Sequence, residues 1–277
     1  SGYLTFKPVL KFYYIKKRFF SLVIPFVVWL PIYAVFYNIK NILHGNYICV
    51  LSSMKEAVFY PDHGGLWFLW VLFLISVLYF LAQKSRYKYP LLIGIIFVLY
   101  LITHFIKIPL FFGLGLVRWH LLFFIMGIYF REYEIIQRIP WKSFVVIVPI
   151  LLFSELSWSR TSSSIMYFHL NTRLQVLYSL FNNYCVAILS IIVIFKISTF
   201  VQFESKYIVW LSKNTLAIYS VHFIFIFSSI QLIQRVISEC FLQTSIVFVL
   251  TLVLSIGLIL IIKLSPCGSK VLFGMEK

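Results

Sequence analysis

Asp62 and His63 form the only neighbouring acid–imidazole pair in the chain, in the stretch YPDHGGLWFLW. An imidazole that a carboxylate orients is a common general base, because the carboxylate raises the basicity of the ring. Adjacent side chains rarely point the same way, so two exposed residues of a polar loop are the simpler interpretation. The sequence leaves both interpretations open.

Basic residues beside apolar runs mark two further candidate sites. They are Lys16, Lys17 and Arg18 before the first run, and Arg118 and His120 beside a tryptophan. Cations at the ends of membrane spans commonly anchor a helix at the lipid headgroups, and a long side chain such as Arg118 reaches the interface by extending along the helix. The alternative is that these groups bind an anionic ligand.

Polar and aromatic residues within or next to the apolar runs allow two interpretations each. Asn182 and Asn183 either bond to neighbouring helices, worth about 0.6–2 kcal/mol, or line a polar tunnel. His222 is a candidate catalytic residue because ionisable groups at membrane depth are commonly functional, although a neutral imidazole bonded to a carbonyl fits equally well. Trp67 is either an interface anchor or a platform for a sugar ring.

Composition predicts a membrane environment for these residues. Hydrophobic residues make up 62% of the chain and charged residues 12%, whereas soluble domains have about 45–50% and about 25%. One core cannot bury that excess, so we expect an all-α bundle of transmembrane helices. The net charge of +16 does not indicate nucleic acid, because the basic residues are scattered between apolar runs. Four cysteines without paired spacing predict neither a metal site nor a disulfide framework.

We expect residues 1–277 to form one membrane domain with eight spans and no soluble domain. The expected spans are Phe20–Tyr37, Leu66–Ala82, Leu91–Ile106, Trp119–Phe130, Phe144–Ser157, Leu174–Phe195, Asn214–Ile230 and Ser245–Ile262. Asn38–Gly65 is the longest polar connection between them. This topology places 17 of the 24 Lys and Arg residues on the side of Ser1. Positive residues mark the cytoplasmic side, so both termini are expected in the cytoplasm and His63 outside the cell membrane.

Five stretches of the chain together resemble one known family. SGYL opens the chain, and YIKKRFFSLVIPF, GGLWFLWVLFLISVLYFL, WHLLFFIMGIYFRE and LSKNTLAIYSVHFIFI follow in order. Over nearly the whole chain they resemble the acyltransferase family 3 membrane proteins. The resemblance implies a membrane O-acyltransferase that moves an acyl group from acyl-CoA, above all acetyl-CoA, to a hydroxyl of an envelope or exported polysaccharide. Its implied partners are the lipid bilayer and a carbohydrate acceptor, including a lipid-linked one, but no nucleic acid.

The resemblance also implies roles for individual residues. The basic residues that would hold the coenzyme A phosphates are Lys16, Lys17 and Arg18. Ser21 replaces the second arginine of the family's basic pair, and Gly65 occupies the place of a family histidine. His222 matches the histidine of the family's Ile-Tyr-x-x-His motif. The candidate substrate-binding residues are Asp62, Trp67, Arg118 and His120.

Two expectations concern the extent of the fold and the alternative function. In the family, SGYL closes a second span, and a first span carries the arginine and histidine considered catalytic. We therefore expect ten spans in the intact protein, with two of them and the catalytic base upstream of Ser1, which leaves His63 and His222 as weaker candidates.

The alternative is a transporter, exporter or structural membrane protein without catalysis. Transporters commonly contain internal repeats with matching broken helices, and the prolines of the first span have no such counterpart.

Overall fold

The computed structural model describes residues 12–61, 65–103, 111–157, 172–199, 205–234 and 240–274, and all regular secondary structure in these ranges is helical. The predicted all-α membrane fold is therefore confirmed. Five described helices are long and apolar enough to cross a membrane. They are Phe12–Tyr37, Leu114–Glu132, Leu177–Ser198, Thr215–Ile233 and Phe241–Lys263.

A helix lies in each of the eight predicted spans, but three of these helices are short. They are α6 (Trp67–Ala82), α7 (Lys88–Leu101) and α10 (Phe144–Leu156), with 16, 14 and 13 residues. At about 1.5 Å per residue they rise about 20–24 Å, which is less than the ~30 Å hydrocarbon core of a bilayer. The number of spans therefore stays a prediction.

The polar connection between the first two predicted spans is largely helical. It contains α4 (Ile39–Leu43) and α5 (Ile48–Phe59). The amide of Asn38 donates hydrogen bonds to the carbonyl of Ala34, at 2.9 Å, and to the hydroxyl of Ser53, at 2.8 Å. Asn38 thus joins the end of the first long helix to α5.

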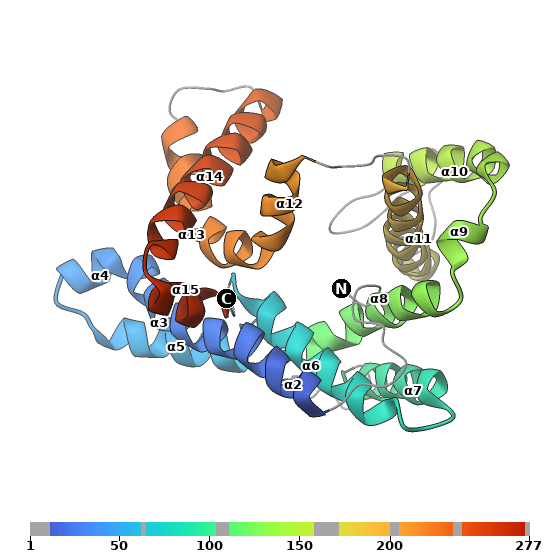
Figure 1. The fold of residues 1–277 in the computed structure, drawn as a ribbon, viewed down its shortest axis with the longest axis horizontal. Coiled ribbons are helices and arrows are strands. Elements are labelled where there is room, and N and C mark those ends of the chain that lie inside the picture. The colour runs from blue at the N-terminus through green and yellow to red at the C-terminus, as the bar shows by residue number, and fades with distance from the viewer. Residues whose placement is uncertain are drawn as a thin grey trace. The chain divides into compact units, whose positions relative to one another are not determined.

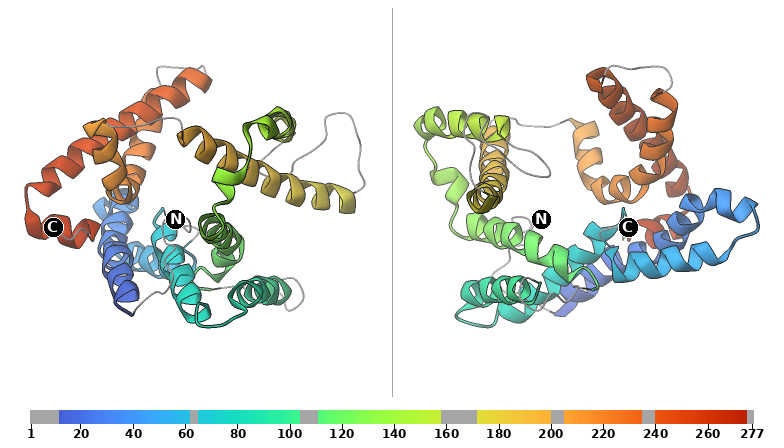
Figure 2. Two further views of the ribbon diagram at one scale, coloured as in Figure 1. Left: turned by 45° about the vertical axis from the view of Figure 1, so that its right-hand side comes forward. Right: turned by 180° about the vertical axis from the view of Figure 1, so that it is seen from behind.

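The described part of the chain divides into two compact units, one within residues 123–199 and the other within residues 12–122 and 205–274. In the first unit, α10 packs beside α11 (Thr172–Ser198) (Figure 1 and Figure 2). The amide of Asn182 donates a hydrogen bond of 3.0 Å to the carbonyl of Ser154. Asn182 therefore joins two neighbouring helices, as the interpretation of a hydrogen bond between helices predicted.

The second unit is built around the first long helix, which runs through α2 (Phe12–Arg18), the π-helical turn η1 (Phe19–Val23) and α3 (Ile24–Tyr37). The π turn has a local cause, because Pro25 lacks an N–H and its ring would clash with the carbonyl of Ser21 in a regular α-helix. Widening the turn moves that carbonyl aside, and the N–H of Ile24 bonds to the carbonyl of Phe19 instead.

The other helices of the second unit complete its core. They are α12 (Lys206–Lys213), α13 (Thr215–Ile233), α14 (Cys240–Lys263) and α15 (Pro266–Phe273), together with α5 to α7 and the start of α8 (Leu114–Glu132). The helices α13 and α14 pack side by side, and α15 packs on α3 (Figure 1). Fully buried side chains of this core include Leu22, Leu69, Val221 and Phe273.

Candidate functional site

A basic pocket of about 410 Å³ lies between the first long helix and α15. The described residues that line it are Tyr13, Lys16, Lys17, Phe20, Ile24, Lys270, Val271 and Gly274. Three lysines therefore line one cavity, and no residue with a carboxylate side chain is among its described lining residues. Such an arrangement suits a polyanion such as a phosphate, because lysines bind phosphates as concentrated point charges.

The pocket depends on a close approach between the π turn and the end of α15. Gly274 follows α15 with φ +60°, a left-handed conformation that favours glycine. A Cβ atom at position 274 would lie 2.5 Å from the Cα of Ser21 and 2.7 Å from the carbonyl oxygen of Phe20. Glycine is thus required there for both conformation and space.

Two side-chain contacts hold α15 on the first long helix. The indole Nε1 of Trp29 donates a hydrogen bond of 2.8 Å to the carbonyl of Leu272. The ring of Phe273, 1% exposed, stacks on the same indole with centroids 6.3 Å apart. These contacts fix the helix that carries Lys270.

Sequence reasoning missed Lys270 because the end of the chain reads as a short basic tail. The sequence did contain two signals. Ser265 followed by Pro266 is typical of the start of a helix, and Gly274, eight residues after the proline, is typical of its end. The structure shows both features, since the Ser265 hydroxyl accepts a hydrogen bond from the N–H of Gly268 and Gly274 ends the helix.

Two of the three basic residues predicted to act together line the basic pocket. Lys16 and Lys17 line the basic pocket, whereas Arg18 is not among its described lining residues. The guanidinium Nε of Arg18 donates a hydrogen bond of 2.8 Å to the hydroxyl of Tyr14, one turn earlier. The three lysines that line the pocket are thus Lys16, Lys17 and Lys270.

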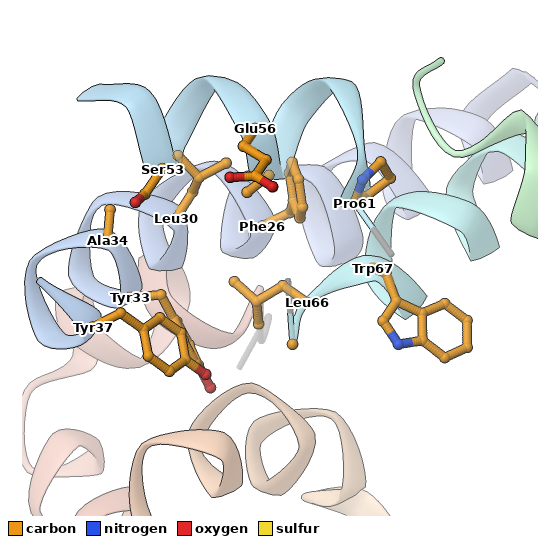
Figure 3. A pocket seen from close by; sticks show the side chains of 12 residues that line it. Phe26, Leu30, Tyr33, Ala34, Tyr37, Ser53, Glu56, Pro61, Leu66 and Trp67 are labelled. Atoms are coloured by element: carbon orange, nitrogen blue, oxygen red, sulfur yellow. The ribbon is translucent and has the colours of Figure 1, made fainter. Parts of the chain in front are cut away.

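A second pocket of about 220 Å³ lies farther along the same helix, and we call it the Glu56 pocket (Figure 3). Its described lining residues come from α3, α5 and the segment that leads into α6. They are Phe26, Leu30, Tyr33, Ala34, Tyr37, Ser53, Glu56, Ala57, Pro61, Gly65, Leu66 and Trp67. Figure 3 shows Glu56 extending from α5 toward Phe26 and Leu30 of α3. Aromatic rings, hydroxyls and one carboxylate therefore meet in a small cavity.

Tyr219 of α13 fixes the start of α6 beside this pocket. Its hydroxyl donates a hydrogen bond of 2.7 Å to the carbonyl of Gly65 and accepts one of 3.1 Å from the N–H of Phe68. Gly65 also packs closely on α13, because a Cβ atom there would lie 2.6 Å from the ring of Phe223. Asp62 and His63 lie outside the described residues, so their proposed roles stay predictions.

Comparison with protein families decides the class of this protein. A family model described as an acyltransferase domain matches residues 1–263. The chain belongs to acyltransferase family 3. No curated protein and no solved structure matches it. The resemblance drawn from the five sequence stretches is confirmed, and the protein is a membrane acyltransferase, a transferase of groups other than aminoacyl groups.

Two of the predicted substrate-binding residues of this acyltransferase lie together. The rings of Trp67 and His120 stack with centroids 4.9 Å apart and an interplanar angle of 26°. Because Trp67 also lines the Glu56 pocket, His120 lies behind one of the aromatic rings of that pocket. This contact supplies a structural role for His120, and its role in substrate binding stays a prediction.

Arg118 of the acyltransferase is held by neighbours on two helices. Its guanidinium donates a hydrogen bond to the hydroxyl of Thr103 and lies 5.0 Å from the ring centroid of Trp119 and 5.7 Å from that of Tyr100. The Nε atom is buried and has no hydrogen-bond partner among the described residues. Both interpretations of Arg118, anchoring and anion binding, are compatible with this geometry.

His222 makes a bond within its own helix. Its Nδ1 lies 2.7 Å from the carbonyl oxygen of Tyr219, a distance at which a protonated Nδ1 donates to that oxygen. His222 is not among the described residues that line either pocket. The bond satisfies one ring nitrogen.

Proposed function

We propose that this acyltransferase takes its acyl group from acyl-CoA bound in the basic pocket and transfers it to a hydroxyl of an envelope or exported polysaccharide. The observation that supports the donor is the meeting of Lys16, Lys17 and Lys270 around one cavity without an acid among its described lining residues. Coenzyme A carries several phosphate charges, and each ammonium group can supply a charge-assisted hydrogen bond to them. The rings of Tyr13 and Phe20 in the same lining suit its adenine base.

The proposed topology places this pocket on the side where acyl-CoA is made. The excess of Lys and Arg on the side of Ser1 favours a cytoplasmic N-terminus in the cell membrane. Lys16 and Lys17 lie near the start of the first long helix, and Lys270 belongs to the C-terminal α15. The Glu56 pocket then lies toward the far end of that helix, on the side of the carbohydrate.

The proposed reaction is an ordinary acyl transfer. The acceptor oxygen attacks the thioester carbonyl while a general base takes the hydroxyl proton, and a tetrahedral oxyanion forms. Its collapse breaks the carbon–sulfur bond, and the proton passes to the departing thiolate, so that an ester and free coenzyme A result. Our first candidate for the base among the residues of this chain is His63 with Asp62. The second candidate is His222.

The proposal is tested by transfer of label from [14C]acetyl-CoA to envelope carbohydrate in membranes that contain the protein. The matched variants are Lys17→Gln and Lys270→Gln in the pocket, with Lys206→Gln as a control, because Lys206 is exposed in α12 and is not among the described pocket residues. Loss of a charge-assisted bond of about 1.5–3 kcal/mol raises the KM for acetyl-CoA about ten- to a hundredfold. An unchanged KM in both pocket variants, at equal protein levels, contradicts the proposed donor site.

A further inference from the structure

The guanidinium of Arg118 carries a positive charge for which the described residues provide no acidic partner. It donates to the hydroxyl of Thr103 and lies over the rings of Tyr100 and Trp119, and all three of these groups are uncharged. Residues 63–131 contain no Asp or Glu. A charged side chain in a membrane helix is costly, and it commonly pairs with an opposite charge or marks a ligand site. The uncompensated charge of Arg118 therefore indicates an anionic ligand.

The guanidinium of Arg118 is held at one end only. It has five N–H donors in a planar fork, and its one hydrogen bond within the described residues is the bond to Thr103. The Nε donor is buried without a partner there, which is uncommon in proteins. The hydroxyl of Thr103 is itself fixed, because it lies 3.0 Å from the carbonyl oxygen of Leu99 and 2.9 Å from that of Tyr100. The rest of the fork suits the oxygens of a phosphate.

An exposed apolar face of α7 leads up to this arginine. Ile93, Phe97 and Tyr100 are four and three positions apart, so they share one face of the helix, and they are 52%, 61% and 43% exposed. We call these three residues the α7 stripe. Trp119, beside the guanidinium, is also exposed. Tyrosine and tryptophan are typical of the level of the lipid headgroups, and an exposed apolar face of a membrane helix meets lipid chains.

A phospholipid matches both parts of this surface. Its phosphate suits the guanidinium of Arg118, and its chains extend from the headgroup toward the middle of the membrane, which is the direction from Arg118 along the α7 stripe. Seven residues of helix rise about 10 Å, which is within the ~15 Å depth of the hydrocarbon of one leaflet. A free phosphate would use the arginine but leave the stripe uncovered.

We propose that Arg118 and the α7 stripe bind an anionic phospholipid, whose phosphate the guanidinium holds while its chains cover the stripe. Zwitterionic phosphatidylcholine has a cationic choline beside its phosphate, and Arg118 repels that group, so the site selects anionic lipids. This inference goes beyond the proposed function, because it needs neither the donor nor the acceptor of acyl transfer. It assigns Arg118 to a lipid partner rather than to the substrate.

The test measures quenching of Trp119 fluorescence in vesicles of phosphatidylcholine that contain the purified protein. The quencher is a small fraction of phosphatidylglycerol or phosphatidylcholine with brominated chains, and the emission of Trp119 is the difference between the wild type and Trp119→Phe. Brominated phosphatidylglycerol is expected to quench this emission at about a tenfold lower mole fraction, the lower end of the effect of a charge-assisted hydrogen bond. Equal quenching by the two lipids in the wild type overturns the inference, whatever the variants do.

Two charge variants and one competitor complete the test. Arg118→Gln should remove the preference, so that both brominated lipids quench Trp119 alike. Lys55→Gln removes a positive charge from an exposed position of α5, and should keep the preference of the wild type. A preference that persists in Arg118→Gln, or that Lys55→Gln also abolishes, contradicts a site at Arg118. Release of brominated phosphatidylglycerol by excess inorganic phosphate would assign the arginine to a soluble anion, and would likewise overturn the inference.

Discussion

The indole Nε1 of Trp29 donates a hydrogen bond of 2.8 Å to the carbonyl oxygen of Leu272, and thereby joins the first long helix to α15. The bond lies two residues from Lys270, the ammonium group that the end of the chain contributes to the basic pocket. The position of that charge therefore depends on a contact outside the pocket.

Trp29→Phe tests this dependence, because it keeps an aromatic ring against Phe273 and removes the indole donor together with part of the buried ring. The carbonyl of Leu272 loses its partner and the core loses volume, so we expect a destabilisation of about 1–3 kcal/mol and weaker acetyl-CoA binding. Thermal unfolding in detergent and titration with acetyl-CoA measure the two effects. Trp141→Phe, in the other compact unit, is the control and should leave acetyl-CoA affinity unchanged. Equal affinity in Trp29→Phe would show that α15 keeps its place without the bond.

Gly274→Ala tests the close approach of α15 and the π turn. The new Cβ would lie 2.5 Å from the Cα of Ser21, and φ of +60° strains any residue with a side chain. We expect a lower unfolding temperature, corresponding to about 1–3 kcal/mol. In Gly94→Ala the Cβ meets nothing within 4 Å and lies inside α7, so that variant should be neutral or more stable by up to about 1 kcal/mol. The same unfolding temperature for both variants would contradict the described packing.

Tyr219→Phe tests the bonds that fix the start of α6. The carbonyl of Gly65 and the N–H of Phe68 both lose the hydroxyl, and we expect a loss of about 1–3 kcal/mol in stability. Faster hydrogen exchange at Phe68, followed by mass spectrometry, should accompany the loss. Tyr207→Phe removes a hydroxyl from a residue that is 69% exposed, and should have no effect. Unaltered exchange at Phe68 in Tyr219→Phe would mean that α6 begins where it does without this bond.

Cysteine labelling tests the proposed orientation in the membrane. In a background without native cysteines, Ser52→Cys in α5 should react with an impermeant maleimide added to intact cells, because α5 lies on the proposed outer side. Ser85→Cys, in the basic turn after α6, should react only after the cells are opened. The opposite pattern would reverse the orientation and move the basic pocket away from the cytoplasm.

Much of this fold could be predicted from local patterns of hydrophobicity. Each predicted span is a mostly apolar run, and a helix lies in every one because a helix satisfies its own backbone hydrogen bonds in lipid. The proposed pairing of Lys16 and Lys17 with a phosphate ligand could likewise be suggested from three consecutive basic residues. These are properties of short stretches.

Contacts between distant parts of the chain could not be predicted in this way. Trp29 and Leu272 are 243 positions apart, and no periodicity connects them. Lys270 therefore looked like one more basic residue of a tail, and Glu56 like one residue of a polar connection. The bond from His222 to the carbonyl of Tyr219 was one of two equal possibilities, because the direction of a ring depends on packing rather than on depth.

Direct titration of acetyl-CoA into the purified protein is the measurement that tests the central claim, the donor site shared by the two ends of the chain. Lys270→Gln removes the positive charge that α15 contributes to the pocket. We expect the affinity of this variant for acetyl-CoA to fall about ten- to a hundredfold. The affinity of the control Lys206→Gln should equal that of the wild type. Wild-type affinity in Lys270→Gln, with the protein folded, would contradict the assignment of the basic pocket to acyl-CoA.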